Sequence, residues 1–293
     1  MGIAVALLWG MGLVFAKAAI GHFPPILLMA IRFTLTALTL VWFVKPPWRH
    51  MGQIFAIALV SGAIQYSLTF SGLVGMDAST AVLVIQLEVP FLVLLGVVLL
   101  KEKPGARKWL GIGIAFVGVA VIVGEPRLVG ASTAVALVVA GSMTWALGQI
   151  MVRRIVGVGG VALIAWMSVF AAPQLFVMSL IFESDHVAHI ASADWVVWGT
   201  VAYLGLVMTA LGYGLWYTLL GRHPVNRVAP FLLLMPVFSV AGGIALLGES
   251  LTPQIVGGGA VVLVGVAVIL LERAPKPTPE PIPATQPGPD STP

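Results

Sequence analysis

Short sequence landmarks occur twice in this chain, in the same order in each half. The pentapeptide Gly-Val-Ala-Val-Ile stands at 118–122 and again at 265–269, a spacing of 147 residues in a chain of 293. Further matching pairs, at spacings of 136 to 147 residues, are Trp9 and Trp145, Gly12 and Gly148, Lys17 and Arg153, Pro90 and Pro236, and Glu102 and Glu249. Self-similarity of this kind indicates one structural unit that occurs twice, with small insertions between its elements.

Each half holds five long apolar stretches. Because five is an odd number, the second half must cross a membrane in the opposite direction to the first. The composition requires a membrane, since 59% of the residues are hydrophobic and 9% are charged, whereas a soluble domain carries about 25% charged residues. We therefore expect an all-α integral membrane protein with ten transmembrane helices in a five-plus-five inverted repeat. Many carriers use such repeats to build two faces that open alternately.

A helix that crosses a bilayer needs about 20 apolar residues. Ten stretches have this length, and prolines mark most of the gaps between them. The predicted spans are 2–21, 24–44, 52–73, 77–100, 106–123, 131–153, 158–181, 195–219, 226–248 and 253–271. Barrel strands fit less well, because they alternate polar and apolar residues over about 10 positions.

These spans divide the chain into two repeats and a tail. We predict a first repeat over 1–125, a second over 130–272 and a disordered, proline-rich cytoplasmic tail over 274–293. A passive tail is favoured over a docking segment for other proteins.

Lysine and arginine residues gather in every second gap between the spans. With the N-terminus inside, the inner gaps and the tail carry twelve of them, and the outer gaps carry only Arg127. The inner set is Lys45, Arg49, Lys101, Lys103, Arg107, Lys108, Arg153, Arg154, Arg222, Arg227, Arg273 and Lys276. By the positive-inside rule, this asymmetry predicts that both termini are cytoplasmic, in an inner (plasma) membrane.

Several residues also resemble a known family, the EamA type of the drug/metabolite transporter (DMT) superfamily. The residues that carry the resemblance are Trp9-Gly10-x-Gly12, Lys17, Pro25, Arg32, Pro90, Glu102, Pro236 and Glu249, together with the glycine-rich fifth and tenth spans. The match covers 1–272, and within the superfamily the chain is most similar to the YddG-type exporters of aromatic amino acids.

The resemblance implies a fold and a function. It implies ten helices in a five-plus-five inverted repeat, a central cavity lined mainly by helices 1, 3, 4, 6, 8 and 9, and export of amino acids or small metabolites. The second half departs from the pattern at Ser168, the counterpart of Arg32, and at Leu234, the counterpart of Glu88. Only the first half therefore offers these two charges within the membrane.

Three ionisable side chains fall inside spans: Lys17, Arg32 and Glu88. A charge at the bilayer centre costs about 2.5–3.5 kcal/mol on insertion scales, so each should face protein or water and have a partner. Glu88, near the midplane, is a candidate to bind a substrate ammonium group or a proton. The alternative is a structural ion pair with Arg32 or a hydrogen bond to a neighbouring helix. For Lys17 and Arg32, nearer the outer ends of their helices, packing and reaching to the interface are favoured.

Aromatic and amide side chains near mid-span are the other candidates for substrate binding. Trp9 and Trp145 lie too centrally to belong to an interfacial aromatic belt; they suit a flat wall for an apolar substrate or, alternatively, packing beside small residues. Pro90 and Pro236 free backbone carbonyls near the midplane, which suits a cavity or a bend. The predicted substrate-binding residues are Trp9, Gln65, Tyr66, Gln86, Glu88, Trp145, Gln149, Tyr213 and Trp216.

Other chemistries find little support. The chain has no cysteine, no phosphate-binding Gly-x-x-x-x-Gly-Lys motif and no catalytic constellation within the spans, so we expect no cofactor and no enzymatic activity. His186 and His189 lie in an acidic outer gap without further ligands, which argues against a metal site. The expected partners are the lipid bilayer and an amino-acid-like substrate, with no nucleic acid, and the glycine-rich spans suggest a homodimer.

We predict a secondary active or facilitative carrier that exports aromatic or other apolar amino acids by alternating access. Two alternatives stay open. A carrier of phosphorylated or nucleotide-sugar metabolites would need several cationic side chains at depth. A non-transporting membrane scaffold would use its tail to recruit other proteins.

Overall fold

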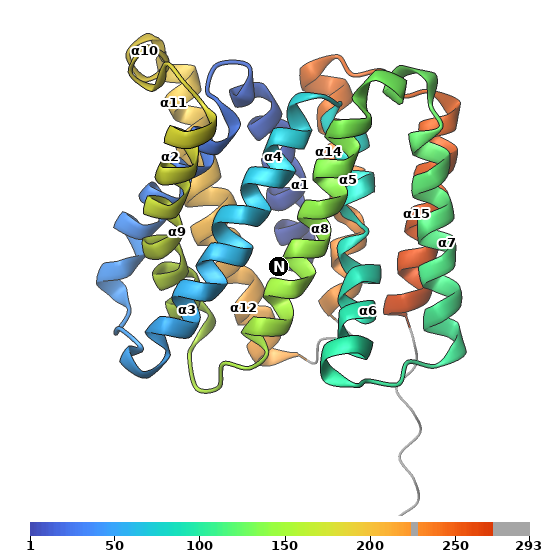
Figure 1. Ribbon diagram of the computed structural model, residues 1–293, viewed down its shortest axis with the longest axis horizontal. Coiled ribbons are helices and arrows are strands. Elements are labelled where there is room, and N and C mark those ends of the chain that lie inside the picture. The colour runs from blue at the N-terminus through green and yellow to red at the C-terminus, as the bar shows by residue number, and fades with distance from the viewer. Residues whose placement is uncertain (224–227, 272–293) are drawn as a thin grey trace, which may run out of the picture.

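The computed structural model describes residues 1–223 and 228–271, which form helices joined by short loops (Figure 1). Ten helical stretches in this part of the chain are long and apolar enough to cross a membrane, as predicted. We number them spans 1 to 10: Gly2–Ile20, Pro25–Phe43, Trp48–Val74, Ala78–Leu100, Ala106–Val123, Ser132–Val152, Gly160–Phe182, Trp195–Trp216, Pro230–Leu247 and Pro253–Leu270. The predicted tail over 274–293 lies outside the described residues.

Some spans are single α-helices and others are interrupted. The uninterrupted helices are α1 (Gly2–Ile20), α2 (Pro25–Leu40), α7 (Ala106–Val123), α8 (Ser132–Val152), α9 (Gly160–Phe182) and α15 (Pro253–Leu270). The interrupted spans are span 3 with α3 (Met51–Ile57) and α4 (Gln65–Val74), span 4 with α5 (Ala78–Ile85) and α6 (Glu88–Leu100), span 8 with α11 (Trp195–Ala202) and α12 (Gly212–Arg222), and span 9 with α14 (Met235–Leu247). A short helix, α10 (His186–Ser192), lies between spans 7 and 8.

The contact between α7 and α15 shows how the two repeats are related. These helices are equivalent, since each carries the repeated pentapeptide, and they lie side by side (Figure 1). Gly111 of α7 faces Gly265 of α15 and Gly118 faces Gly258, so residue numbers rise along one helix as they fall along the other. Equivalent helices that run antiparallel require inverted repeats, which confirms the predicted fold.

Each repeat also packs its first span against the other repeat. Helix α1 contacts α14 and α12, and α8 contacts α4 and α6. A Cβ added to Gly12 would meet the side chain of Met208, and one added to the equivalent Gly148 would meet Ser61. Ser61 and Met208 are themselves 147 residues apart, so the two contacts are equivalent. The centre of the bundle is therefore built by both repeats together.

The interruptions occur at equivalent places in the two repeats. Spans 3 and 8 contain π-helical segments, Ala58–Ile64 and Tyr203–Leu211. Span 4 breaks between α5 and α6, and span 9 changes from a 3₁₀ helix, Ala229–Leu234, into α14. Pro90 and Pro236 lie in the first turns of α6 and α14, where a missing N–H breaks no hydrogen bond. Such breaks often mark binding sites in membrane proteins.

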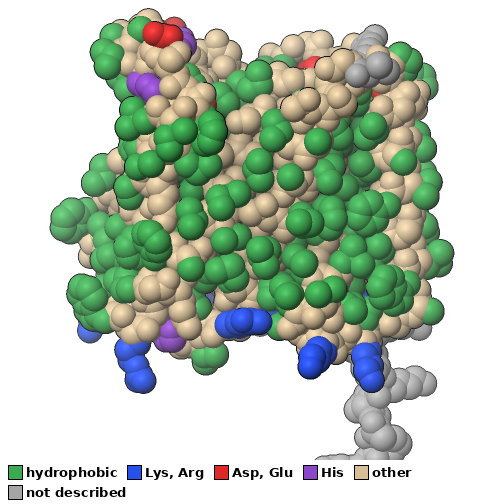
Figure 2. Space-filling model, in the orientation of Figure 1, with side chains coloured by type: hydrophobic (Ala, Val, Ile, Leu, Met, Phe, Trp, Pro, Cys, Tyr) green, Lys and Arg blue, Asp and Glu red, His purple; other side chains and the backbone are tan. Residues whose placement is uncertain are grey.

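Charged side chains separate toward the two ends of the bundle, with a hydrophobic band between them (Figure 2). The basic end is defined by Lys45, Arg49, Lys101, Lys103, Arg107, Arg153, Arg154 and Arg222. The acidic end is defined by Asp77, Glu125, Glu183, Asp185, Asp194 and Glu249. This separation follows from the alternating direction of the spans.

Candidate functional site

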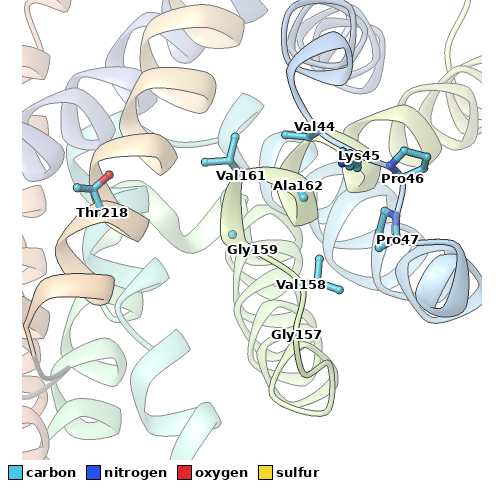
Figure 3. A pocket seen from close by; sticks show the side chains of 11 residues that line it. Val44, Lys45, Pro46, Pro47, Gly157, Val158, Gly159, Val161, Ala162 and Thr218 are labelled. Carbon is cyan, nitrogen blue, oxygen red and sulfur yellow. The ribbon is translucent and has the colours of Figure 1, made fainter.

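An open pocket of about 620 Å³ lies at the basic end (Figure 3). It is lined by residues 44–47 between spans 2 and 3, by residues 157–162 at the start of span 7, and by Thr218 of α12. Among the described residues of this lining, Lys45 is the charged one. Elements of both repeats thus surround a single opening.

A smaller pocket of about 370 Å³ opens at the same end, between α1, α12 and the start of span 9. Leu219 and Val228 belong to its lining. These two residues and Val5 also form a buried apolar cluster, and Trp9 and Trp216 pack against that cluster. A layer of apolar side chains therefore separates this pocket from two of the predicted substrate-binding residues.

Three of the predicted residues meet in one aromatic cluster. The Trp9 ring centroid lies 4.9 Å from that of Tyr213 and 5.7 Å from that of Trp216, with the rings tilted. The Trp9 indole Nε1 donates a hydrogen bond to the Met208 carbonyl at 3.1 Å, which satisfies its polar atom. Gly212 leaves room for the indole, because an added Cβ would lie 2.6 Å from Nε1. Spans 1 and 8 thus form an aromatic wall.

Tyr66 lies in a second aromatic group on span 3. Its ring stacks on Phe70 at 5.6 Å and meets Phe33 edge-on at 4.9 Å. The guanidinium carbon of Arg32 lies 5.0 Å from the Tyr66 ring centroid. None of these contacts reaches Trp9, so the described structure does not bring Tyr66 into the first cluster.

Gln65 faces span 6 and is almost fully buried, with 4% of its surface exposed. Its Nε2 donates to Thr69 Oγ1 at 3.1 Å, whereas its Oε1 has no hydrogen-bond partner in the described part of the chain. The same is true of Ser61 Oγ, one turn earlier. Positions 61, 65 and 69 follow one another at helical spacing, and Gly148 and Gly141 of α8 pack against the first and last.

Gln86 and Glu88 flank the break in span 4. Gln86 follows the end of α5, and Glu88 is the first residue of α6. Glu88 is partly buried, and among the described residues its carboxylate has neither a hydrogen bond nor an ion pair. The structural ion pair with Arg32 that the sequence left open is therefore absent from the described residues.

Trp145 and Gln149 are one turn apart on α8, and both are partly exposed. Within the described residues, neither side chain makes a hydrogen bond or a ring contact. Trp145 therefore differs from its equivalent Trp9, whose indole is bound. The side chains of Trp145 and Gln149 therefore remain available to bind another molecule.

The two basic residues within spans behave differently from each other. Lys17 Nζ donates to the backbone carbonyls of Leu73 at 2.8 Å and Val74 at 3.1 Å, at the end of span 3. Arg32 is 0% exposed, so the expectation that it reaches the interface is wrong. It is held in place instead by a hydrogen bond from Nε to Thr209 Oγ1 at 2.9 Å.

Carboxylates join the two repeats at the acidic end, a role that sequence reasoning missed. Glu249 accepts hydrogen bonds from the backbone N–H groups of Ala78 at 2.6 Å and Ser79 at 3.0 Å, in the first turn of α5. Glu183 accepts in the same way from two N–H groups of the first turn of α2, at 2.7 and 2.9 Å. A carboxylate that directly follows one span and faces the positive start of another was the available signal.

Removing the Glu249 carboxylate should loosen this end. Glu249→Ala leaves two buried N–H groups without an acceptor, which costs about 1–3 kcal/mol for each such group. We expect a lower Tm in thermal unfolding of the detergent-solubilised protein. Asp194→Ala is the matched control, because Asp194 caps only its own helix through Val197 N at 2.9 Å. Equal losses of Tm in both variants would contradict a joining role for Glu249.

The chain matches the sequence model of one family in both halves. That family is described as the EamA-like transporter family, and the matched residues are 1–124 and 132–271. Two relatives carry the name "Probable amino-acid metabolite efflux pump". The Salmonella typhimurium protein is 31% identical and the Escherichia coli protein 30% identical, each over 278 residues that cover 92% of this chain and 93% of the relative.

More distant matches agree in length and fold. An Archaeoglobus fulgidus protein named "Uncharacterized transporter" is 26% identical over 272 residues, which cover 90% of this chain and 95% of the relative. One solved crystal structure aligns with a TM-score of 0.63 over 91% of this chain and 94% of its own, at 20% identity. At that identity, the alignment shows the similarity of the fold alone.

Proposed function

This chain belongs to the EamA-like transporter family, and we propose that it exports aromatic and other apolar amino acids by alternating access. Membership of the family makes it a multi-pass membrane transporter, a class of protein that is not enzymatic. The names of the Salmonella and Escherichia relatives support amino-acid metabolites as the substrate class. The aromatic wall formed by Trp9, Tyr213 and Trp216 supports an apolar side chain.

The observation that carries the proposal is the state of the Glu88 carboxylate. A carboxylate near the middle of a span is expensive to keep in the membrane, and this one has no partner among the described residues. A ligand that brings a positive charge would supply that partner. The α-ammonium group of an amino acid has the required charge and donors, so we assign Glu88 to its recognition.

The remaining predicted residues divide into polar and apolar contacts. Gln65, Gln86 and Gln149 would hydrogen-bond the polar end of the substrate. Trp145 would contact its side chain, together with the Trp9 aromatic wall. Tyr66, which lies on span 3 apart from the Trp9 cluster, would line the path of the substrate.

The inverted repeats support alternating access. Both pockets described above lie at the basic end. We propose that the central region opens to the basic end in one conformation, and that a second conformation exchanges the roles of the repeats.

The charge distribution supports a direction for export. An excess of lysine and arginine marks the cytoplasmic side of membrane proteins, so we place the basic end and both termini in the cytoplasm of an inner (plasma) membrane. A homodimer through the glycine-rich spans stays a prediction. Within the described residues, the glycines at 111, 118, 258 and 265 pack α7 against α15 of the same chain.

Liposomes that contain the purified full chain test the proposed substrate. We expect labelled phenylalanine to enter faster than into protein-free vesicles, and unlabelled tryptophan or leucine to compete. Phenylalanine entry at the rate of protein-free vesicles would show that the amino-acid assignment is wrong. A panel of sugar phosphates and nucleotide sugars, measured in the same vesicles, tests the second transporter class.

Truncating Trp145 should change the ranking of substrates. Burying a large apolar side chain contributes about 1.5–3 kcal/mol, so Trp145→Ala should lower phenylalanine uptake roughly tenfold relative to valine uptake. Trp195→Ala is the control, because that indole is 83% exposed at the start of span 8. A ranking that stays the same in both variants would count against contact between the Trp145 indole and the substrate.

A phosphorylated or nucleotide-sugar substrate fits this site less well. Such anions require cationic side chains that are free to bind them. Lys17 is occupied by two backbone carbonyls, and Arg32 is fully buried against Thr209. Glu88 is the ionisable residue near mid-span that has no hydrogen bond or ion pair among the described residues, and it is acidic.

A further inference from the structure

Arg32 is a cation for which the described part of the chain offers no counter-ion. It is 0% exposed in the middle of span 2, and no carboxylate among the described residues lies within ion-pair distance. Its Nε donates to Thr209 Oγ1 at 2.9 Å and its Nη1 to Met29 Sδ at 3.6 Å, while Nη2 has no partner among the described residues. The Tyr66 ring, 5.0 Å away, offsets part of the cost of the charge. The strong directional contact of this side chain is therefore the one to Thr209.

Thr209 belongs to the π-helical segment Tyr203–Leu211 of span 8. Its hydroxyl accepts from Arg32 and donates to the Leu204 carbonyl at 2.7 Å, five residues back, which is the spacing of a π turn. Thr36, one turn after Arg32, donates to the Gly205 carbonyl at 3.0 Å. Span 2 thus holds the π-helical segment at two points, and one of them is a charge-assisted hydrogen bond.

The same segment presents the groups that hold span 1. The Met208 carbonyl, next to Thr209, accepts the hydrogen bond from Trp9 Nε1 at 3.1 Å. The Tyr203 hydroxyl, at the other end of the segment, donates to the Leu8 carbonyl at 3.1 Å. The position of the Trp9 indole against Tyr213 and Trp216 therefore depends on the path of this π turn.

The other repeat provides an internal comparison. At the equivalent positions, Ser168 stands for Arg32 and Gly62 for Thr209. Ser168 Oγ donates to the Ile164 carbonyl of its own helix at 2.7 Å, and Gly62 packs against Ala171. Span 7 does bond to span 3, from Gln174 Nε2 to the Phe55 carbonyl at 3.4 Å and from Ser67 Oγ to Met178 Sδ at 3.7 Å, but among the described residues neither bond reaches the π-helical segment 58–64. In the same part of the chain, the equivalent indole, that of Trp145, has no hydrogen-bond partner. The hydrogen bond from Arg32 to Thr209, which we call the tether, thus holds a π-helical segment in the repeat pair that binds the Trp9 indole, and the described part of the other repeat has neither a bond onto its π-helical segment nor a bound indole.

We propose that Arg32 is a positioning residue: by holding Thr209 it fixes the Met208 carbonyl, and through that carbonyl it fixes the Trp9 indole of the aromatic wall. Its consequence for substrate choice rests on the proposed function, whereas the positioning itself does not. Arg32 touches no substrate in this scheme. It acts across 177 residues of sequence, through a contact between the two repeats.

Two variants remove the tether from opposite sides. Arg32→Met keeps much of the side-chain length and removes the donor, and Thr209→Val keeps the shape and removes the acceptor. Ser168→Ala is the matched control, because it changes the equivalent position without touching a tether. Thr209→Val also serves as the independent test if Arg32→Met yields too little folded protein.

Hydrogen–deuterium exchange and tryptophan fluorescence of the purified full chain measure the positioning. We expect both tether variants to raise the rate of backbone amide exchange over residues 203–211 at least about threefold, since local opening of this segment becomes easier. The exchange rate over residues 58–64 should stay unchanged. They should also shift the tryptophan emission, and the shift should vanish when Trp9→Phe is added. Unchanged exchange and emission in a folded tether variant would overturn the proposal, whatever the substrate is.

Amino-acid uptake into liposomes measures the consequence for substrate choice. In liposomes, both tether variants should change the ratio of tryptophan to valine uptake at least about threefold, and Ser168→Ala should not. A loss of folded yield with an unchanged ratio, exchange and emission would make Arg32 a purely structural residue and refute the proposal. If the wild-type protein moves neither amino acid, the proposed function fails, and exchange and emission still decide on the positioning.

Discussion

Replacing Glu88 by glutamine is expected to lower the initial rate of amino-acid transport roughly 10- to 100-fold, with little loss of folded protein. Glutamine has almost the same shape and keeps a hydrogen-bond acceptor, but it removes the negative charge. A hydrogen bond to a charged group contributes about 1.5–3 kcal/mol, and each 1.4 kcal/mol corresponds to about a tenfold change in rate. Because the Glu88 carboxylate has no hydrogen bond or ion pair among the described residues, the folded state loses no such interaction in the variant.

A second glutamate separates the loss of charge from the loss of fold. Glu102→Gln removes a carboxylate whose ion pair with Arg153, at 3.1 Å, is half exposed at the basic end, and exposed pairs contribute little. Its transport rate should stay close to that of the wild type in the same liposomes. A variant Glu88→Gln with poor folded yield but normal activity per folded molecule would show that the carboxylate is structural.

Replacing Gly118 by leucine is expected to remove most of the folded protein. A Cβ at this position would lie 2.5 Å from Val262 N and 2.8 Å from the Gly258 carbonyl, both backbone atoms of α15. Membrane helices associate by close packing of small residues, so the two helices would have to separate along their length. Overpacking costs about 1–3 kcal/mol even where side chains can move, and backbone atoms move less easily.

Gly113 is the matched control, since it lies on the same helix and an added Cβ there would meet nothing within 4 Å. Gly113→Leu should give near wild-type amounts of monodisperse protein in size-exclusion chromatography, whereas Gly118→Leu should give little. Gly265→Leu should behave like Gly118→Leu, because its Cβ would lie 2.5 Å from Ala115 N. Equal yields for Gly118→Leu and Gly113→Leu would refute the close approach of α7 and α15.

The two repeats share a backbone plan but differ in chemistry at equivalent positions. Arg32 and Glu88 have the uncharged counterparts Ser168 and Leu234, and Gln65 corresponds to Gly212, beside which the Trp9 indole fits. The two halves of the central region are therefore unlike in polarity. A substrate with one polar and one apolar end can use both halves, which is consistent with an apolar amino acid.

Much of the fold could be predicted from the sequence. The number of spans, their approximate limits and the inversion of the repeats follow from apolar length, an odd span count and repeated landmarks. These features arise from forces that act on each segment separately, because every apolar run of this length must be buried in lipid and every backbone N–H must be satisfied within its own helix. The separation of basic and acidic ends follows from the same alternation.

The candidate site was predictable only in part. Central tryptophans and intramembrane polar residues are visible in the sequence. Trp9 meets Tyr213 and Trp216 because spans 1 and 8 lie side by side in the fold. The burial of Arg32 was not visible, because its partner Thr209 is an ordinary residue 177 positions away. The π-helical segments were not visible either, since no residue type marks them.

The sequence by itself thus determined an inverted pair of five-span repeats in a membrane, because hydrophobic length and charge asymmetry act locally and in every such chain. Only the tertiary structure decided which polar groups are satisfied. It gave the Arg32 side chain Thr209 as its partner, bound the Trp9 indole but not that of Trp145, and left Glu88 without a partner among the described residues. Hydrogen bonds depend on distances of a few tenths of an ångström between atoms that folding brings together, and sequence spacing does not contain those distances.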